Sequence, residues 1–233
     1  MATAVQTLVE IVERRRAGET AHPAMVVTLN PEMVMMARRS QPFSSVLESA
    51  ALVVPDGIGL VRALRRRGHP KVVRIGGADL IGAYLPMAER HAHRIALVGG
   101  APGVARAARD RMVAMHPRLQ VVAVSDGPPG KTTADEVEQS RPEMVLAAFG
   151  AGRQELFLDR YLVPIGAASG IGVGGTLDFL AGRVRRAPAA VRRIGLEWAW
   201  RLAVQPWRLR RQSVLPVFWW LERREAAELR AAR

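Results

Sequence analysis

Apolar and polar positions follow two different periods along residues 24–180. Five short runs are almost continuously apolar, as strands buried on both faces are; they cover residues 25–29, 51–54, 94–99, 119–125 and 143–150. The segments between them carry apolar residues at helical spacing, in residues 46–50, 58–68, 78–91, 103–116 and 153–163. This alternation predicts an α/β fold with a Rossmann-like, mostly parallel sheet, flanked by helices and joined by right-handed crossovers.

The pattern changes after about Gly182. No further strand-like run follows, and all five tryptophans of the chain lie beyond this point, among many arginines. Pro206 and Pro216 are expected to divide this segment into three helical pieces, because proline interrupts a helix interior. We therefore predict an α/β domain over residues 1–182 and a basic, tryptophan-rich helical appendage over residues 183–233.

The net charge is +13, and residues 183–233 hold thirteen arginines against four glutamates. Such a positive segment favours an anionic partner: nucleic acid, lipid headgroups or a phosphorylated substrate. The alternative is a solvated helix face in an arginine-rich protein, which is supported by the presence of only two lysines. The chain has no cysteine, no signal-peptide core and no run of about twenty apolar residues. We therefore expect a cytoplasmic protein.

Two nucleotide-binding motifs are incomplete. Residues 125–133 end in Gly-Lys-Thr, but Ser125 replaces the first glycine of a P-loop and two prolines remove amides that would bind phosphate. Residues 170–175 match G-x-G-x-x-G without the βαβ context that a dinucleotide needs. The five histidines form no H-E-x-x-H motif, and no D-x-D pair is present. Neither a metal nor a cofactor is expected.

Polar residues follow the predicted strands and should meet at one edge of the sheet, where open α/β sheets bind ligands. They are Thr28, Asn30, Asp56, Arg74, Gly99, Gly100 and Gln154. Each also has a purely structural interpretation. Asp56 fits a Pro-Asp-Gly turn, and Asn30 before Pro31 fits a helix N-cap. Arg74 and Gln154 could be solvated side chains, and the role of Gly99 and Gly100 could be limited to making a tight turn.

Several stretches together resemble one family of bacterial glycosyltransferases, the WecG/TagA/CpsF family, over nearly the whole chain. They are TLNPE, VVPDGIGLV, RIGGADL, LVGGAPG, FGAGRQE, GVGGTLDFLAGRVRRAP and GLEWAWRLAVQPWRLRR. The resemblance implies inverting transfer of an N-acetylmannosamine-type sugar from a UDP donor to undecaprenyl-diphosphate-linked N-acetylglucosamine, in the synthesis of teichoic acid or related surface polymers. The family usually has proline and lysine where this chain has Gly152 and Arg153.

The resemblance also implies roles for individual residues. Asp56 would be the general base, and the implied substrate-binding residues are Thr28, Asn30, Arg74, Gly99, Gly100, Gln154 and Glu155. The lipid diphosphate and the membrane would be met by Arg201, Arg208 and Arg211, on an appendage that places the enzyme peripherally on the inner face of the cell membrane. No metal is implied, and the oligomeric state is left open.

The residue chemistry is compatible with this mechanism. An inverting transfer needs one base, and burial after residues 51–54 should raise the pKa of Asp56. Arginines and helix N-termini can stabilise the departing UDP. Trp219 and Trp220 suit a membrane interface, whereas Trp198 and Trp200 are expected to fill the seam between appendage and core. A nucleic-acid-binding module and a nicotinamide-dependent oxidoreductase are the alternatives.

Overall fold

A six-stranded, entirely parallel sheet forms the centre of the protein, in a computed structural model that describes residues 1–231. The strand order is β2-β1-β6-β5-β3-β4. The strands are β1 (Ala24–Leu29), β2 (Leu52–Pro55), β3 (Arg94–Gly99), β4 (Gln120–Ser125), β5 (Met144–Ala148) and β6 (Ser169–Gly172). The five strands predicted from apolar runs are confirmed, as is the α/β class.

Strand β6 was not predicted, although it lies at the centre of the sheet between β1 and β5. Its sequence, Ser-Gly-Ile-Gly, lacks the apolar run that marks the other strands. A Cβ atom on Gly170 would lie 2.6 Å from Leu158, and one on Gly172 would lie 2.4 Å from Gln154. The glycines therefore let helix α8 (Arg153–Ile165) approach the strand closely. The G-x-G-x-x-G stretch at residues 170–175 is part of this strand and the turn that follows it.

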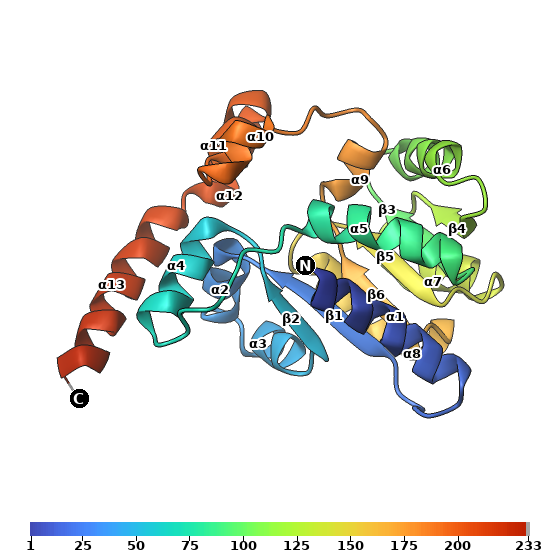
Figure 1. The fold of residues 1–233 in the computed structure, drawn as a ribbon, viewed down its shortest axis with the longest axis horizontal. Helices are drawn as coiled ribbons and strands as arrows, with labels where there is room; N and C mark the ends of the chain where they lie inside the picture. The colour runs from blue at the N-terminus through green and yellow to red at the C-terminus, as the bar shows by residue number, and fades with distance from the viewer. Residues whose placement is uncertain (232–233) are drawn as a thin grey trace.

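Helices cover both faces of the sheet (Figure 1). One face packs against α1 (Ala2–Arg16), α5 (Gly77–Arg90), α6 (Val104–Met115) and α9 (Thr176–Leu180). The other face packs against α2 (Pro31–Ala37), α3 (Gln41–Glu48), α7 (Lys131–Glu138) and α8 (Arg153–Ile165). Two apolar cores, one on each face, thus hold the sheet rigid and fix the positions of the loops at its carboxyl edge.

The C-terminal segment is helical, as predicted, but its divisions differ. It contains α10 (Ala189–Arg193), α11 (Glu197–Val204), a 3₁₀ turn η1 (Pro206–Arg208), α12 (Leu209–Gln212) and α13 (Leu215–Ala231). Pro206 opens η1, and Pro216 lies in the first turn of α13, directly after the break between α12 and α13 at residues 213–214. Proline is tolerated there because the first-turn amides of a helix have no intrahelical acceptor.

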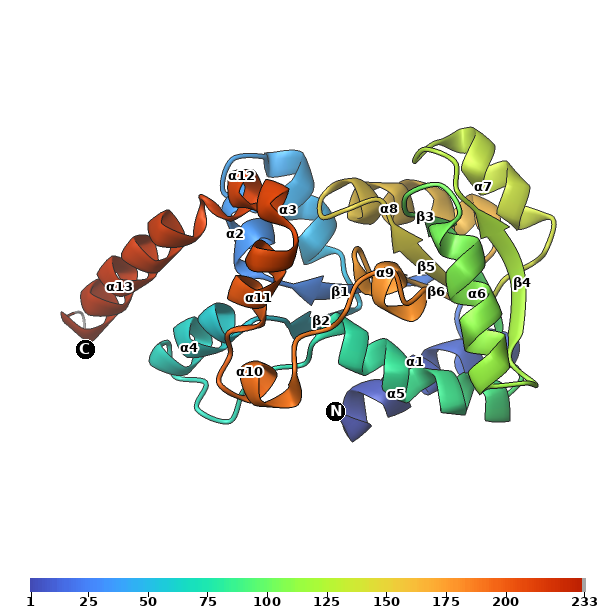
Figure 2. The same cartoon turned by 90° about the horizontal axis from the view of Figure 1, so that it is seen from above.

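Helix α13 connects the appendage to the α/β part. The side chain of Phe218 is buried in a third apolar cluster with Met35 of α2 and Leu60 of α4 (Ile58–Arg66). Figure 2 shows α11 and α12 beyond the carboxyl end of β1, with α13 running away from the sheet. The division of the chain into two domains at Gly182 stays a prediction. The last two residues of the appendage, 232–233, lie outside the described range. No helix within residues 1–231 is both long and apolar enough to span a bilayer.

Candidate active site

A cavity of about 870 Å³ lies at the carboxyl edge of the sheet, between the strand ends and the appendage. It is lined by most of the residues that the sequence singled out: Thr28, Asn30, Asp56, Arg74, Gly100, Gln154, Arg201, Arg208 and Arg211. Gly99 and Glu155 lie outside its lining. Convergence of the strand-end residues is therefore confirmed, and three arginines of the appendage join them.

Asp56 follows the last residue of β2 and lines the cavity. Its backbone N–H donates to the Leu29 carbonyl at 2.7 Å, and the amide of Gly77 donates to its Oδ2 at 3.3 Å. Gly57 has φ of 95° and precedes the first residue of α4, so the chain turns sharply at Asp56 and Gly57 between β2 and this helix. The turn and the ligand-facing interpretations are thus compatible, because the turn is what directs the carboxylate into the cavity.

The environment of Asp56 raises its proton affinity. Burial raises the pKa of the carboxyl above its usual value, while the Gly77 amide and the positive charge of Arg74 act in the opposite direction. Burial dominates because it removes water from the charged form. The residue therefore has the property expected of a general base: a carboxylate that accepts a proton more readily than one in water.

Thr28 and Asn30 lie beside Asp56 at the end of β1. The buried Thr28 hydroxyl donates to the Gly172 carbonyl at 3.3 Å. Asn30 is the N-cap of α2, where its Oδ1 accepts from the Met33 amide at 3.1 Å. The structural interpretation of Asn30 is confirmed, and the same side chain lines the cavity.

Gln154 is 4% exposed, so the interpretation of a solvated side chain is wrong. Its Oε1 accepts from the Gly174 amide at 3.1 Å, and its Nε2 donates to Glu155 Oε1 at 2.7 Å. Glu155 is fully buried behind it and also accepts from the Gly152 amide at 2.7 Å. Gly152 has φ of 87°, which a proline cannot adopt. Glu155 thus orients Gln154 from outside the cavity.

Gly99, the last residue of β3, and Gly100, which follows it, also differ in whether they face the cavity. Gly100 lines the cavity, and Gly99 lies behind it. A Cβ atom on Gly99 would lie 2.6 Å from the ring of Phe149, and its φ is 85°. Gly99 therefore serves the close packing of β3 on β5, while Gly100 can present its backbone to a ligand.

Three arginines project into the cavity from the appendage: Arg201 of α11, Arg208 of η1 and Arg211 of α12. A Cβ atom on Gly175 would lie 3.2 Å from Arg208 Nη2 and 3.3 Å from Arg201 Nη2, so both guanidinium groups converge on this turn. Burial, followed by the charges of Arg201 and Arg211, lowers the pKa of Arg208 to about 10. The cavity therefore concentrates positive charge suited to a diphosphate.

A separate ionic network connects the appendage to the catalytic edge; it contains Asp79, Glu197, Arg74, Arg186 and Arg192. Asp79 of α5 accepts two hydrogen bonds from Arg186, each 2.7 Å long, and one from Arg192 at 3.2 Å. Arg74 donates to Glu197 at 3.1 Å, so it is not a free surface charge. Sequence analysis did not identify Asp79 or Glu197, because neither follows a strand.

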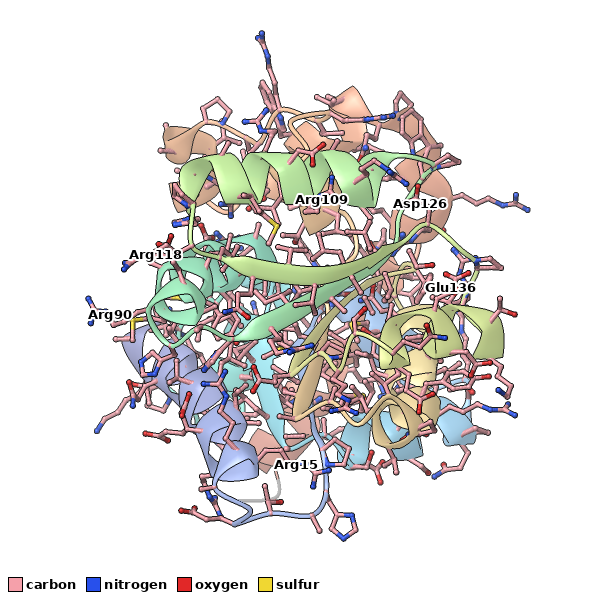
Figure 3. All side chains as sticks on the ribbon, turned by 90° about the vertical axis from the view of Figure 1, so that its right-hand side faces the viewer. Arg15, Arg90, Arg109, Arg118, Asp126 and Glu136 are labelled. Atoms are coloured by element: carbon pink, nitrogen blue, oxygen red, sulfur yellow. The ribbon has the colours of Figure 1, made fainter. Side chains whose placement is uncertain are left out.

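Two further carboxylates line the cavity and were also missed. Asp126 follows β4, and its Oδ2 accepts from the Gly103 amide at 2.7 Å. Figure 3 shows Asp126 and Arg118 at opposite ends of this edge strand. The Asp-Gly pair directly after β4 repeats the Asp-Gly pair that follows β2 at Asp56. Asp178 of α9 lies near Arg201 and Arg208, and burial raises its pKa against their opposing charges.

The tryptophans differ in part from expectation. Trp198 lines the cavity and is 38% exposed, so it does not fill the seam. Trp200 is half-buried, and its Nε1 donates to the Arg185 carbonyl at 3.3 Å. Trp207 is 70% exposed and Trp220 is 58% exposed, while Trp219 borders the cavity. The two most exposed tryptophans, Trp207 and Trp220, therefore lie on η1 and α13.

Comparisons with known proteins find one family and a set of named relatives. A family model described as "Glycosyl transferase WecG/TagA/CpsF family" matches residues 1–232. Relatives from Bacillus spizizenii and Bacillus subtilis are 34% and 32% identical over 197 residues, which is 84% of this chain and 77% of theirs. A Staphylococcus aureus relative is 26% identical over 222 residues, 93% of this chain and 86% of its own. All three are named N-acetylglucosaminyldiphosphoundecaprenol N-acetyl-beta-D-mannosaminyltransferase.

Proposed function

Because the chain belongs to the WecG/TagA/CpsF glycosyltransferase family, we propose that it transfers N-acetylmannosamine to N-acetylglucosaminyl-diphosphoundecaprenol. The donor is a UDP-sugar and the anomeric centre is inverted. The names of the relatives support this substrate pair. They give no support to the nucleic-acid-binding or oxidoreductase alternatives. The observation that carries the proposal is a carboxylate, Asp56, in one cavity with three converging arginines.

Asp56 is the general base in this mechanism. The hydroxyl oxygen of the acceptor sugar forms a bond to the anomeric carbon of the donor as its proton passes to the Asp56 carboxylate. The bond between that carbon and the UDP oxygen breaks, and its electron pair leaves with UDP. The raised pKa of Asp56 favours this role, since the carboxylate is a stronger base than one in water.

Thr28, Asn30, Arg74, Gly100 and Gln154 bind the two sugars and the UDP moiety. This assignment is supported by the position of the five residues on the cavity wall, together with Asp56. Backbone amides of the turn after β3 and nearby guanidinium groups can stabilise the negative charge that develops on departing UDP. Gly99 and Glu155 contribute by packing behind these residues, as their locations indicate.

We assign the diphosphate of the lipid acceptor to Arg201, Arg208 and Arg211. They lie on the appendage, which also carries the exposed rings of Trp207, Trp219 and Trp220. Tryptophan rings suit the headgroup region of a bilayer, and arginines near an anionic surface contribute about 1 kcal/mol each. The enzyme would therefore act at the inner face of the cell membrane, held peripherally by the appendage.

Transfer from a panel of UDP-sugars to a short-chain lipid-diphosphate N-acetylglucosamine tests the activity directly. We expect a disaccharide-lipid product with UDP-N-acetylmannosamine or its uronic acid, and at most traces of product with the Asp56→Asn variant. Absence of transfer from every UDP-sugar would refute the proposed function.

Deletion of the residues after Arg193 tests the membrane assignment separately. We expect the truncated chain to lose flotation with anionic liposomes and to lose activity on liposome-embedded acceptor. Normal activity of the truncated enzyme on that acceptor would show that the appendage is not needed at the membrane.

A further inference from the structure

Two histidines and a glutamate meet at the amino edge of the sheet, away from the transfer cavity. Glu13 lies near the end of α1, and His91 and His93 flank the turn between α5 and β3. One ligand atom from each residue lies within 4.8 Å of the other two. In Figure 3, Arg90, which directly precedes His91, lies on the opposite side of the molecule from Asp126 of the cavity. The proposed transfer reaction uses none of these three side chains.

We propose that Glu13, His91 and His93 bind a divalent transition-metal ion, with zinc as the best match. Two imidazole nitrogens and one carboxylate oxygen are ligands that zinc prefers, whereas magnesium and calcium prefer oxygen ligands alone. This site is independent of the transfer cavity and of the proposed function.

The distances fit a metal after a small rearrangement. His93 Nε2 lies 2.9 Å from Glu13 Oε1, and His91 Nδ1 lies 3.6 Å from the same oxygen. Tetrahedral zinc with ligands at its usual bond lengths places ligand atoms about 3.3 Å apart. The side chain of His91 is 34% exposed, so rotation of its ring can complete the triangle without disturbing the core.

His93 is already oriented as a ligand. It is fully buried, and the hydroxyl of the buried Tyr84 lies 2.7 Å from its Nδ1. A tyrosine hydroxyl can accept from Nδ1–H, which leaves the Nε2 lone pair for a metal.

The backbone between the histidines places both rings on one side. Ala92 has φ of 52°, a left-handed conformation that L residues other than glycine rarely adopt. The turn is held by hydrogen bonds from the Ala92 amide to the Glu89 carbonyl and from the His93 amide to the Ala88 carbonyl. The two ring centroids are 5.6 Å apart.

Arg16 is the main charge that opposes a bound cation, since its Nη1 donates to Glu13 Oε1 at 3.1 Å. Its stronger partner is Glu143, which accepts from Nε at 2.5 Å and from Nη2 at 2.7 Å. Glu143 therefore neutralises the guanidinium, and the charge of Glu13 is available to a metal. Because Glu13 and His91 are partly exposed, water can complete the coordination and the ion can exchange.

Zinc binding to the untagged full-length chain, stripped with a chelator, tests the proposal by equilibrium dialysis and metal analysis. We expect one zinc ion per chain, at least tenfold weaker binding in His91→Ala and in Glu13→Gln, and little binding of magnesium. Zinc should raise the melting temperature of the wild type and leave that of His91→Ala unchanged. The matched control is His116→Ala, because His116 faces a single carboxylate, Glu89, at 3.6 Å.

Results that would contradict the metal site can be told apart from a failure of the variant to fold. His91 is partly exposed, so its alanine variant should fold, and circular dichroism confirms this before titration. Unchanged zinc affinity in both variants, no stoichiometric binding by the wild type, or equal loss in His116→Ala would each overturn the site. Sugar transfer is not the readout, so the result does not depend on the function proposed above.

Discussion

Replacement of Asp56 by asparagine separates proton transfer from substrate binding. Asparagine keeps the size of the side chain and an oxygen that can accept from the Gly77 amide at 3.3 Å. It cannot take the proton of the attacking hydroxyl. Removal of a general base typically costs about 10²–10⁴-fold in rate, so kcat should fall by that factor. The affinity for UDP should change little, because our proposal assigns its diphosphate to arginines and backbone amides and not to Asp56.

The pH dependence follows from the raised pKa of Asp56. The base works in its ionised form, so wild-type kcat/KM should fall as the pH is lowered through that pKa, which lies above the usual value for an aspartate. The folded state also binds this proton more tightly than the unfolded chain does. Ionised Asp56 therefore destabilises the fold at neutral pH, and its protonation at lower pH relieves the cost.

The Asp56→Asn substitution should consequently stabilise the protein while it slows turnover. The gain should be present at neutral pH and shrink as the pH is lowered toward about 4, where the carboxyl also becomes protonated in the unfolded chain; each tenfold difference in proton affinity corresponds to about 1.4 kcal/mol. Urea unfolding at the two pH values measures it, beside Asp135→Asn, an exposed carboxylate paired with Lys131. Turnover near the wild-type rate, or a variant less stable at neutral pH than the wild type, would refute the reasoning.

Three further predictions concern the cavity wall and the appendage. Arg208→Ala should raise the KM for the lipid acceptor at least tenfold in steady-state kinetics and change UDP affinity less; an equal loss of both would contradict the assignment to the acceptor. Glu155→Ala should cost about 1–3 kcal/mol in urea unfolding and lower kcat/KM, because it leaves buried donors of Gln154 and Gly152 without an acceptor. Gly172→Ala should cost about 1–3 kcal/mol because its Cβ would lie 2.4 Å from Gln154, whereas the control Gly82→Ala, with no atom within 4 Å, should be neutral or stabilising.

The fold was largely predictable because burial on both faces leaves a strong pattern. Strands β1 to β5 all carry an apolar run in sequence; β1, β3 and β5 are almost fully buried, whereas the edge strands β2 and β4 are only partly buried. Strand β6 was not predicted, because close packing and not hydrophobicity determines which residues it contains. Gly170 and Gly172 are needed where α8 packs against the strand, and glycine carries no hydrophobic signal. Helix α1 was also not predicted, because its composition is polar and only one stripe of the helix is buried.

The site was predictable to the extent that position along a strand determines position in space. Residues directly after parallel strands meet at one edge, and this rule brought Asp56, Thr28 and Gln154 together. Asp126 obeys the same rule and could have been found by it. Asp79 and Glu197 could not, because their roles come from arginines far away in the sequence; Arg74 and Glu197 are 123 positions apart.

The two sets of arginines around the cavity differ in how many carboxylates pair with their positive charges. Arg74, Arg186 and Arg192 share the carboxylates of Asp79 and Glu197, so their charges hold the appendage in place. This network leaves one positive charge uncompensated, three arginines against two acids.

The second set, Arg201, Arg208 and Arg211, makes fewer direct ion pairs, although Asp178 lies near Arg201 and Arg208. Arg211 pairs with Glu32, while the buried Nε of Arg201 has no hydrogen-bond partner within residues 1–231. The lowered pKa of Arg208 reflects burial beside two like charges. A diphosphate would relieve this repulsion, since it supplies the missing negative charge in a partly dry site. A diphosphate bound to these three arginines, as we propose, would therefore also stabilise the contact between the appendage and the cavity, because linkage between two equilibria is reciprocal.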